Sequence, residues 1–325
     1  MKNGCWVETD IHYGSDPMQS GDLFLAPSFS SGTPVVLNIH GGGWSSMSRK
    51  DAAAISRFLV ETGCAVFSID YRLAGPEHPW PACGDDSRKA ADFLLGGGLA
   101  AHGVVPGRLW IVGASSGGHL ALWTGSHLPP ERVAGVVSIS GIADPVPDAA
   151  ANPHRYRTLF GGCEPTPANL GTVDIVRLAQ RGGPRVLLTH AEEDTVVPFA
   201  SAENFHRAYR AAGGDVTLRR YSTNDEPNWG GHCIWRRDLP VRERLLSLVE
   251  DEIARFMGRK KSCWSGETDN DATRRASRSR EAVCAGRFPS GTVPRERPGF
   301  HRPSSAGAPG REGVCDIRGN PAGTS

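Results

Sequence analysis

Short, mostly apolar runs alternate with segments of helical spacing over the first 256 residues. The strand-like runs occupy 34–39, 64–69, 108–113, 133–140, 185–190 and 215–221, and helical spacing covers 51–61, 85–95, 117–126, 202–213 and 241–256. Continuous apolar runs are typical of strands buried on both faces, and strands separated by long helical segments form mostly parallel sheets. The sequence therefore predicts a doubly wound α/β domain with helices on both faces of the sheet.

Two segments depart from this alternation. Residues 6–13 and 21–25 are joined by a Gly/Ser/Asp/Pro stretch, which predicts an antiparallel strand pair. Residues 142–183 are rich in Pro, Gly and Asn, and so long an excursion within a compact domain predicts a small lid. Its Tyr156 and Phe160 fit a pocket wall that selects substrates, with a structural brace as the alternative.

The last 67 residues differ from the rest in composition. Residues 259–325 contain 13 Lys and Arg against 7 Asp and Glu, together with 9 Gly and 6 Pro. Such a segment buries too little apolar area to offset the entropy lost on ordering. We therefore predict a folded domain over residues 1–258 and a disordered basic tail over 259–325.

Overall charge and cysteine spacing exclude several classes of protein. The net charge of +1 lacks the basic excess of a nucleic-acid binder, and no run of 18 apolar residues predicts a membrane span. The N-terminus has no secretory signal pattern, and the eight cysteines include no C-x-x-C pair. The prediction is a protein of the cytoplasm with reduced thiols and no metal site. Its oligomeric state is left open.

The strongest chemical motif is the pentapeptide at 113–117. Its sequence, Gly-Ala-Ser-Ser-Gly, matches G-x-S-x-G and stands between an expected strand and an expected helix. Flanking glycines allow a turn sharp enough to hold Ser115 at the strand tip, beside the amide-bearing start of the helix. Ser115 is therefore the predicted nucleophile, and the alternative is an ordinary serine in a tight turn.

A glycine run follows the expected strand at 34–39. It reads His40-Gly41-Gly42-Gly43-Trp44, and such a run brings backbone N–H groups close to a substrate without side chains in the way. Gly42 and Gly43, with the amide of Ser116, form the predicted oxyanion hole. A phosphate-binding loop and a plain turn are the alternatives, but the chain lacks both the G-x-x-x-x-G-K-[ST] pattern and a G-x-G-x-x-G after a strand.

Taken together, HGGGW, DYRLAGPEHPWPA and GASSGGHLA resemble the α/β-hydrolase superfamily, in its branch of hormone-sensitive-lipase-like and kynurenine-formamidase-like serine hydrolases. The resemblance spans about residues 6–258 and implies an α/β-hydrolase fold. Gly75 is an insertion relative to the usual D-Y-R-L-A-P-E-H-P motif, and His119 after the elbow is closer to formamidase-like relatives. The short N-terminal segment implies a lightly capped member.

The resemblance also implies a catalytic acid and a histidine in the order Ser…Asp…His. The D-x-x-V-P pattern falls on Asp194, with Glu192 and Glu193 as alternatives, and the Gly-His pair after the last strand falls on His232. His40, His119 and His190 are expected to be structural.

These motifs predict a serine hydrolase that cleaves small carboxylic esters through an acyl-enzyme intermediate, with no cofactor. An arylformamidase-like amide hydrolase is the first alternative, and a catalytically silent ligand-binding protein is the second. The expected partner is a small ester or amide substrate.

Overall fold

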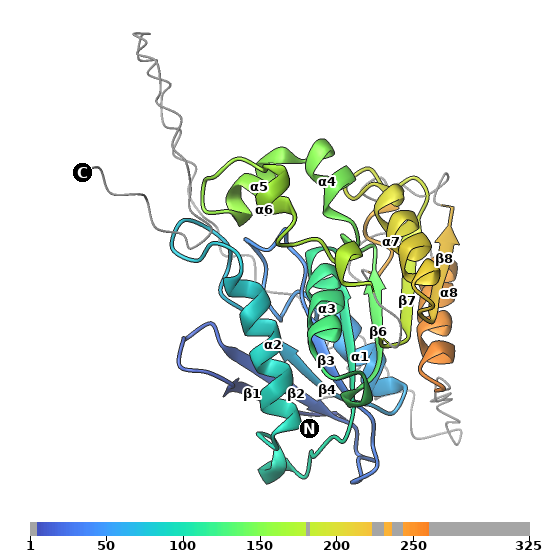
Figure 1. Ribbon diagram of the computed structural model, residues 1–325. Coiled ribbons are helices and arrows are strands. Elements are labelled where there is room, and N and C mark those ends of the chain that lie inside the picture. Colours follow the sequence, from blue (N-terminus) through green and yellow to red (C-terminus); the bar gives the residue numbers. More distant parts are fainter. Residues whose placement is uncertain (1–4, 180–182, 223–230, 236–242, 260–325) are drawn as a thin grey trace, which may run out of the picture. The chain divides into compact units, whose positions relative to one another are not determined.

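The computed structural model describes residues 5–179, 183–222, 231–235 and 243–259 (Figure 1). The strands are β1 (Trp6–His12), β2 (Ser20–Leu25), β3 (Val35–Ile39), β4 (Ala65–Ile69), β5 (Leu109–Ala114), β6 (Val133–Ile139), β7 (Val186–Ala191) and β8 (Val216–Tyr221). The α-helices are α1 (Ala53–Glu61), α2 (Ala82–Leu95), α3 (Ser116–His127), α4 (Pro145–Ala151), α5 (Pro153–Leu159), α6 (Pro167–Leu170), α7 (Phe199–Ala211) and α8 (Glu243–Phe256). Single 3-10 turns lie at Ala100–His102, Pro130–Arg132 and Val176–Leu178.

All eight strands form one sheet in the order β1-β2-β4-β3-β5-β6-β7-β8. β2 runs antiparallel to both β1 and β4, and every other neighbouring pair is parallel. The predicted antiparallel pair at the N-terminus and the predicted mostly parallel sheet are therefore both confirmed.

Alternate residues of the central strands enter two separate cores. Val35, Leu37 and Ile39 of β3 lie in the core beneath α2, α3 and α7, whereas Val36 lies in the core beneath α1 and α8. Successive side chains of a strand point to opposite faces, so both faces of the sheet must be covered. Helices cover both faces, as the sequence predicts (Figure 1).

The order of the strands reverses direction beside β3. The chain passes from β3 through α1 to β4 on one side, and then crosses through α2 to β5 on the other side of β3. In open α/β sheets, ligands bind at the carboxyl ends of the strands, in the crevice where the order reverses. The fold therefore favours a site between the loops that follow β3 and β5.

The segment at 142–183, called the lid here, leaves the carboxyl end of β6 and returns to β7. Its helices α4, α5 and α6 lie above the carboxyl ends of the parallel strands in Figure 1. The side chains of Tyr156 and Leu159 are fully buried. The Tyr156 ring packs edge-on against Trp44, with 5.4 Å between ring centroids. This burial favours the structural brace over the pocket wall for Tyr156.

Replacing Tyr156 with alanine is therefore expected to lower stability more than it changes substrate preference. Removing a buried aromatic ring costs about 3–5 kcal/mol through lost burial and the cavity left behind. Thermal unfolding monitored by circular dichroism measures this loss. Tyr156→Phe keeps the ring and should unfold close to the parent protein. An unchanged Tm for Tyr156→Ala would contradict the brace.

Within the described residues, no helix has the length and apolar character needed to cross a membrane. Cys5, Cys64 and Cys83 are free thiols. Cys163 in the lid is disulfide-bonded, so the expectation of reduced thiols does not hold at that position.

Arg259, the first residue of the predicted tail, donates hydrogen bonds to the carbonyl oxygens of Thr62 and Gly63 at 3.0 and 2.9 Å. The rest of the predicted tail, 260–325, lies outside the described residues, and the domain boundary remains a prediction.

Candidate active site

Ser115 stands in a sharp turn between β5 and α3. Its φ is +55° and its ψ is −126°, a conformation that residues with a side chain rarely adopt. A Cβ on Gly117 would lie 2.2 Å from the Ile39 carbonyl oxygen, and one on Gly113 would lie 2.1 Å from the Gly117 carbonyl oxygen. Both positions therefore need glycine, as the motif predicts.

Three predicted site residues lie in one chain of hydrogen bonds. His232 Nε2 lies 3.0 Å from Ser115 Oγ, and His232 Nδ1 lies 2.8 Å from Asp194 Oδ2. A carboxylate oxygen only accepts, so the proton of a neutral His232 belongs on Nδ1. Nε2 is then free to accept the proton of the Ser115 hydroxyl.

Four donors surround the Asp194 carboxylate. The backbone N–H groups of Val196 and Val197 donate to Oδ1, each at 2.9 Å, and Oδ2 also lies 3.2 Å from Nε2 of the buried His190. Burial raises the pKa of Asp194, but hydrogen bonds from His190 and His232 outweigh burial and bring the pKa well below its usual range. Asp194 is therefore ionised at neutral pH.

The two alternative acids have other partners. Glu192 pairs with Arg220 at 3.2 Å, and the Glu193 carboxylate accepts a hydrogen bond from Ser222 at 2.9 Å. Of the three acidic residues in this turn, Asp194 is the one hydrogen-bonded to His232.

The glycine loop after β3 lies against the serine turn. Ile39 is paired with Gly113 in the parallel register of β3 and β5, so the residues after each strand meet at the predicted reversal point. A Cβ on Gly41 would lie 2.9 Å from the Ala114 carbonyl oxygen. The Trp44 N–H donates to Ser116 Oγ at 3.1 Å, which ties the loop to the first residue of α3. The Ser116 N–H, at this helix start, has no acceptor inside the helix.

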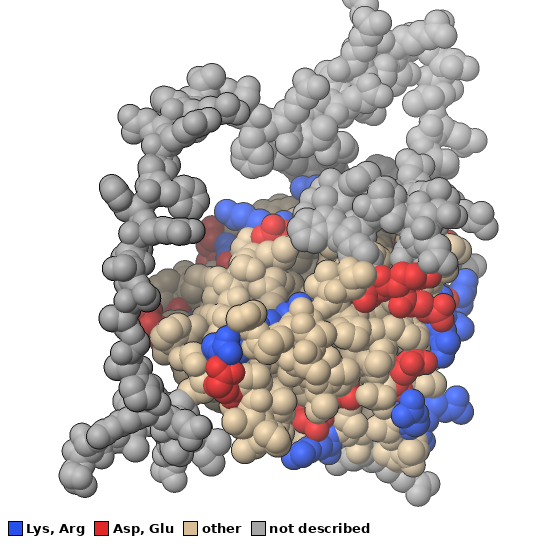
Figure 2. Space-filling model, turned by 90° about the horizontal axis from the view of Figure 1, so that it is seen from above, with Lys and Arg blue, Asp and Glu red and all other residues tan. Residues whose placement is uncertain are grey.

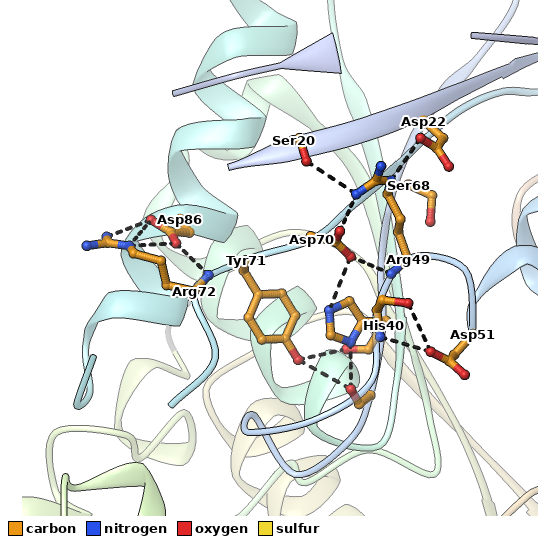
Figure 3. Close-up of polar contacts among 12 residues, drawn as sticks. Ser20, Asp22, His40, Arg49, Asp51, Ser68, Asp70, Tyr71, Arg72 and Asp86 are labelled. Carbon is orange, nitrogen blue, oxygen red and sulfur yellow. Dashed lines mark hydrogen bonds and ion pairs between the residues drawn. The ribbon is translucent and has the colours of Figure 1, made fainter. Parts of the chain in front are cut away.

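A buried polar network lies behind the glycine loop (Figure 3). The His40 ring stacks on Tyr71 with 4.2 Å between centroids, His40 Nδ1 donates to the Gly41 carbonyl at 2.7 Å, and Tyr71 Oη donates to the His40 carbonyl at 3.1 Å. Burial lowers the pKa of His40, so the ring is neutral. The Asp70 carboxylate, 3.9 Å from His40 Nε2, therefore faces an uncharged imidazole. The main partner of Asp70 is instead Arg49.

Trp44 is fully buried and contacts the lid through His119. Trp44 Nε1 donates to His119 Nδ1 at 3.3 Å, and His119 Nε2 donates to the Val173 carbonyl of the lid at 2.9 Å. Burial lowers the pKa of His119 to about 4, and a neutral ring fits these two contacts. His40 and His119 thus make structural contacts, as predicted, and Trp44 is a core residue.

Several residues around this site carry no motif signal. His190 is structural, as expected, in its contact with the Val197 carbonyl at 3.0 Å, but its contact with Asp194 was not predicted. Asn152 and Arg155 of the lid both reach the turn that holds Asp194, and nothing in the sequence singles them out. Among the described residues, no group of three or more His, Cys, Asp and Glu side chains could hold a metal ion.

Solved structures of esterases share this fold. A truncated carbohydrate esterase from gut microbiota is 21% identical and aligns with a TM-score of 0.63, over 79% of this chain and 97% of that one. At this identity the likeness concerns the fold, and with the parallel sheet and its helices it establishes the α/β-hydrolase fold predicted from the motifs.

Curated relatives match shorter stretches. The carboxylic ester hydrolase LipN of Mycobacterium tuberculosis is 34% identical over 122 residues. The match covers 36% of this chain and 32% of LipN, so this chain spans about a third of that relative's length. The kynurenine formamidase of Danio rerio is 27% identical over 224 residues, covering 66% of this chain and 73% of that protein. The BD-FAE family model matches residues 22–209, more than half of the chain. The chain is therefore an α/β-hydrolase that belongs to the BD-FAE family.

Proposed function

We propose that this protein is a serine hydrolase that cleaves small carboxylic esters through an acyl-enzyme intermediate. The observation that carries the proposal is the hydrogen-bonded chain from Ser115 through His232 to Asp194, set beside a loop of three glycines. The similarity to LipN, an ester hydrolase by name, supports the same reaction.

In the proposed mechanism, Ser115 Oγ attacks the ester carbonyl while His232 Nε2 takes the hydroxyl proton. Asp194 keeps the proton of His232 on Nδ1 and stabilises the imidazolium that forms. The negative charge that develops on the carbonyl oxygen is stabilised by the N–H groups of Gly42, Gly43 and Ser116.

Collapse of the tetrahedral intermediate breaks the bond to the leaving alcohol. The alcohol receives its proton from His232, and the acyl group stays on Ser115. Water then repeats the cycle: His232 removes its proton, the oxygen attacks the acyl carbon, and the carboxylic acid leaves as Ser115 regains its proton. The residues supply every proton transfer, so no cofactor is needed.

The face above the carboxyl ends of the strands is consistent with a small, uncharged substrate. In the part of this face that grey atoms do not cover, charged residues lie mainly around the margin and the middle is largely tan (Figure 2). The lid supplies three short helices of seven, seven and four residues, which are a small cover for a long acyl chain.

We propose the cytoplasm as the location of the protein.

Formamide hydrolysis is the second candidate, because the formamidase match covers two thirds of this chain. The same residues would act on an amide, with His232 protonating the leaving amine. A catalytically silent protein is the third, and the intact contacts of Ser115 with His232 count against it.

The deciding experiment compares kcat/KM for p-nitrophenyl acetate, butyrate and octanoate with kcat/KM for N-formylkynurenine. The proposal expects the short esters to be the better substrates. Preference for N-formylkynurenine would favour the formamidase, and absence of turnover on all four, with tight binding of one, would favour the ligand-binding protein.

The glycine loop provides a separate test. Gly42 has φ +105°, and a Cβ there would lie 2.1 Å from the Ser46 carbonyl oxygen. Gly42→Ala must therefore displace the loop, and loss of one oxyanion donor lowers kcat about a hundredfold to a thousandfold. Gly75→Ala is the matched control, because a Cβ there meets nothing within 4 Å. Steady-state kinetics of both variants check this expectation, and an unchanged kcat in Gly42→Ala would contradict it.

A further inference from the structure

The lid is hydrogen-bonded to the turn that holds Asp194. The Val196 carbonyl accepts two bonds from lid side chains, one from Asn152 Nδ2 at 3.1 Å and one from Arg155 Nη2 at 3.3 Å. The N–H of the same residue, Val196, donates to Asp194 Oδ1 at 2.9 Å. Val196 thus connects the lid to the Asp194 carboxylate.

Arg155 is held in a fixed position in α5. Its Nη1 lies 3.0 Å from both carboxylate oxygens of Asp148 in α4, and the Asp148 side chain is fully buried while that of Arg155 is 16% exposed. Asn152 also donates to Asp148, at 3.1 Å. A buried carboxylate with these donors fixes the direction of the guanidinium and of the bond that it makes to Val196.

The same side chain borders the glycine loop. The atoms nearest to a Cβ placed on Gly43 are Cγ, Cδ and Nε of Arg155, at 3.7, 3.9 and 4.0 Å. One lid residue therefore lies between the acid turn and the predicted oxyanion donors, although none of the three motifs contains it.

We propose that Arg155 is a positioning residue for the catalytic acid, and that the docked lid holds the Asp194 turn in its active geometry. The inference rests on the proposed function for the role of Asp194. If the lid leaves its place, the Val196 carbonyl loses both side-chain donors and the carboxylate loses a fixed support. Misplacement of a reacting group by about 1 Å can reduce the rate on the order of a hundredfold.

Two other roles for Arg155 make different predictions. A purely stabilising ion pair with Asp148 would change Tm and leave the chemistry of the folded protein unchanged. A direct substrate contact would change KM, and by different factors for different acyl groups. A positioning role instead lowers kcat by a similar factor for every ester and alters the contact between His232 and Asp194.

The test uses Arg155→Lys in the full-length protein. Lysine keeps a positive charge for Asp148, so the carboxylate is not left unpaired, but its single ammonium lacks the planar fork that reaches Asp148 and Val196 together. The matched control is Arg157→Gln on the same helix, because Arg157 pairs with the exposed Glu164. If Arg155→Lys fails to fold, the double variant Asp148→Asn/Arg155→Gln is used in its place, because it removes both buried charges together.

The first readout is kcat and KM for three p-nitrophenyl esters as a function of pH, together with Tm. We expect Arg155→Lys to lower kcat on the order of tenfold for each ester with little change in KM or Tm. The acid limb of the kcat/KM profile should move to lower pH, because a displaced carboxylate stabilises the His232 imidazolium less. Arg157→Gln should match the parent protein. A drop in Tm with an unchanged pH profile, or a change in KM alone, overturns the proposal.

The second readout does not depend on activity. The His232 Nδ1 proton bonded to Asp194 gives a downfield proton NMR signal, which can be assigned by its loss in His232→Gln. This signal should shift in Arg155→Lys and stay in place in Arg157→Gln. If the parent protein hydrolyses none of the substrates, the proposed function fails, while the position of this signal still decides whether Arg155 positions Asp194.

Discussion

Ser115→Ala is expected to abolish turnover and leave the fold intact. The change removes one hydroxyl from a residue that is 8% exposed, and alanine keeps the same Cβ in the same turn. The loss of a serine nucleophile in such a site lowers kcat about a millionfold. Hydrolysis of p-nitrophenyl acetate measures the activity, and thermal unfolding should give a Tm within a few degrees of the parent.

A fluorophosphonate probe provides the complementary measurement. It should label the parent protein at Ser115 and fail to label Ser115→Ala, whereas the exposed-serine control Ser222→Ala should be labelled at the parental rate. Near-parental hydrolysis by Ser115→Ala, or labelling mapped to another residue, would remove Ser115 from the mechanism.

Asp194→Asn is expected to lower kcat about ten-thousandfold, because asparagine can present an N–H to His232 and so favour the wrong tautomer. Hydrogen bonds from His190 and His232 hold the pKa of Asp194 well below its usual range in spite of its burial. Between pH 5 and 9, the parent protein therefore has an ionised carboxylate throughout, and the defect of Asp194→Asn should persist over this whole range.

The neighbouring acids are the matched controls for this variant. Glu192→Gln and Glu193→Gln change carboxylates whose contacts are with Arg220 and Ser222, so their kcat values should stay within a few-fold of the parent. The kcat of all three variants is measured on one short ester. A large loss in Glu193→Gln with a mild one in Asp194→Asn would shift the assigned acid by one residue.

Most of the fold could be predicted, because each strand of the sheet has its own signal in the local sequence. The expected strand at 34–39 and the observed β3 (Val35–Ile39) differ by one residue, since a strand buried on both faces is apolar at every position. Helix starts were less accurate: α2 begins at Ala82, three residues before the expected Asp85, and α7 at Phe199, three before Ala202. Pro81 and Pro198 directly precede these helices, a place where proline is well tolerated.

The candidate site also has one part that the sequence predicts and another that it does not. Ser115 and the glycine loop follow strands directly, so short motifs reveal both. The support of Asp194 by Asn152 and Arg155 joins residues 44 and 41 positions from Val196, and no local pattern encodes such a contact. The burial of Tyr156 against Trp44 likewise depends on how the lid docks. Hydrophobicity alone could not decide whether Tyr156 lines a pocket wall or acts as a structural brace.

The separation of Ser115 and His232 along the chain has a consequence during protein synthesis. The two residues in hydrogen-bond contact lie 117 positions apart. His232 follows β8, which is the last strand among the described residues and one edge of the sheet. A ribosome-bound chain that ends before residue 232 therefore carries the serine and the glycine loop without the proposed base. In the proposed mechanism such a chain lacks the base that activates Ser115, so recovery of ester hydrolysis in a refolding experiment reports the arrival of His232 beside Ser115.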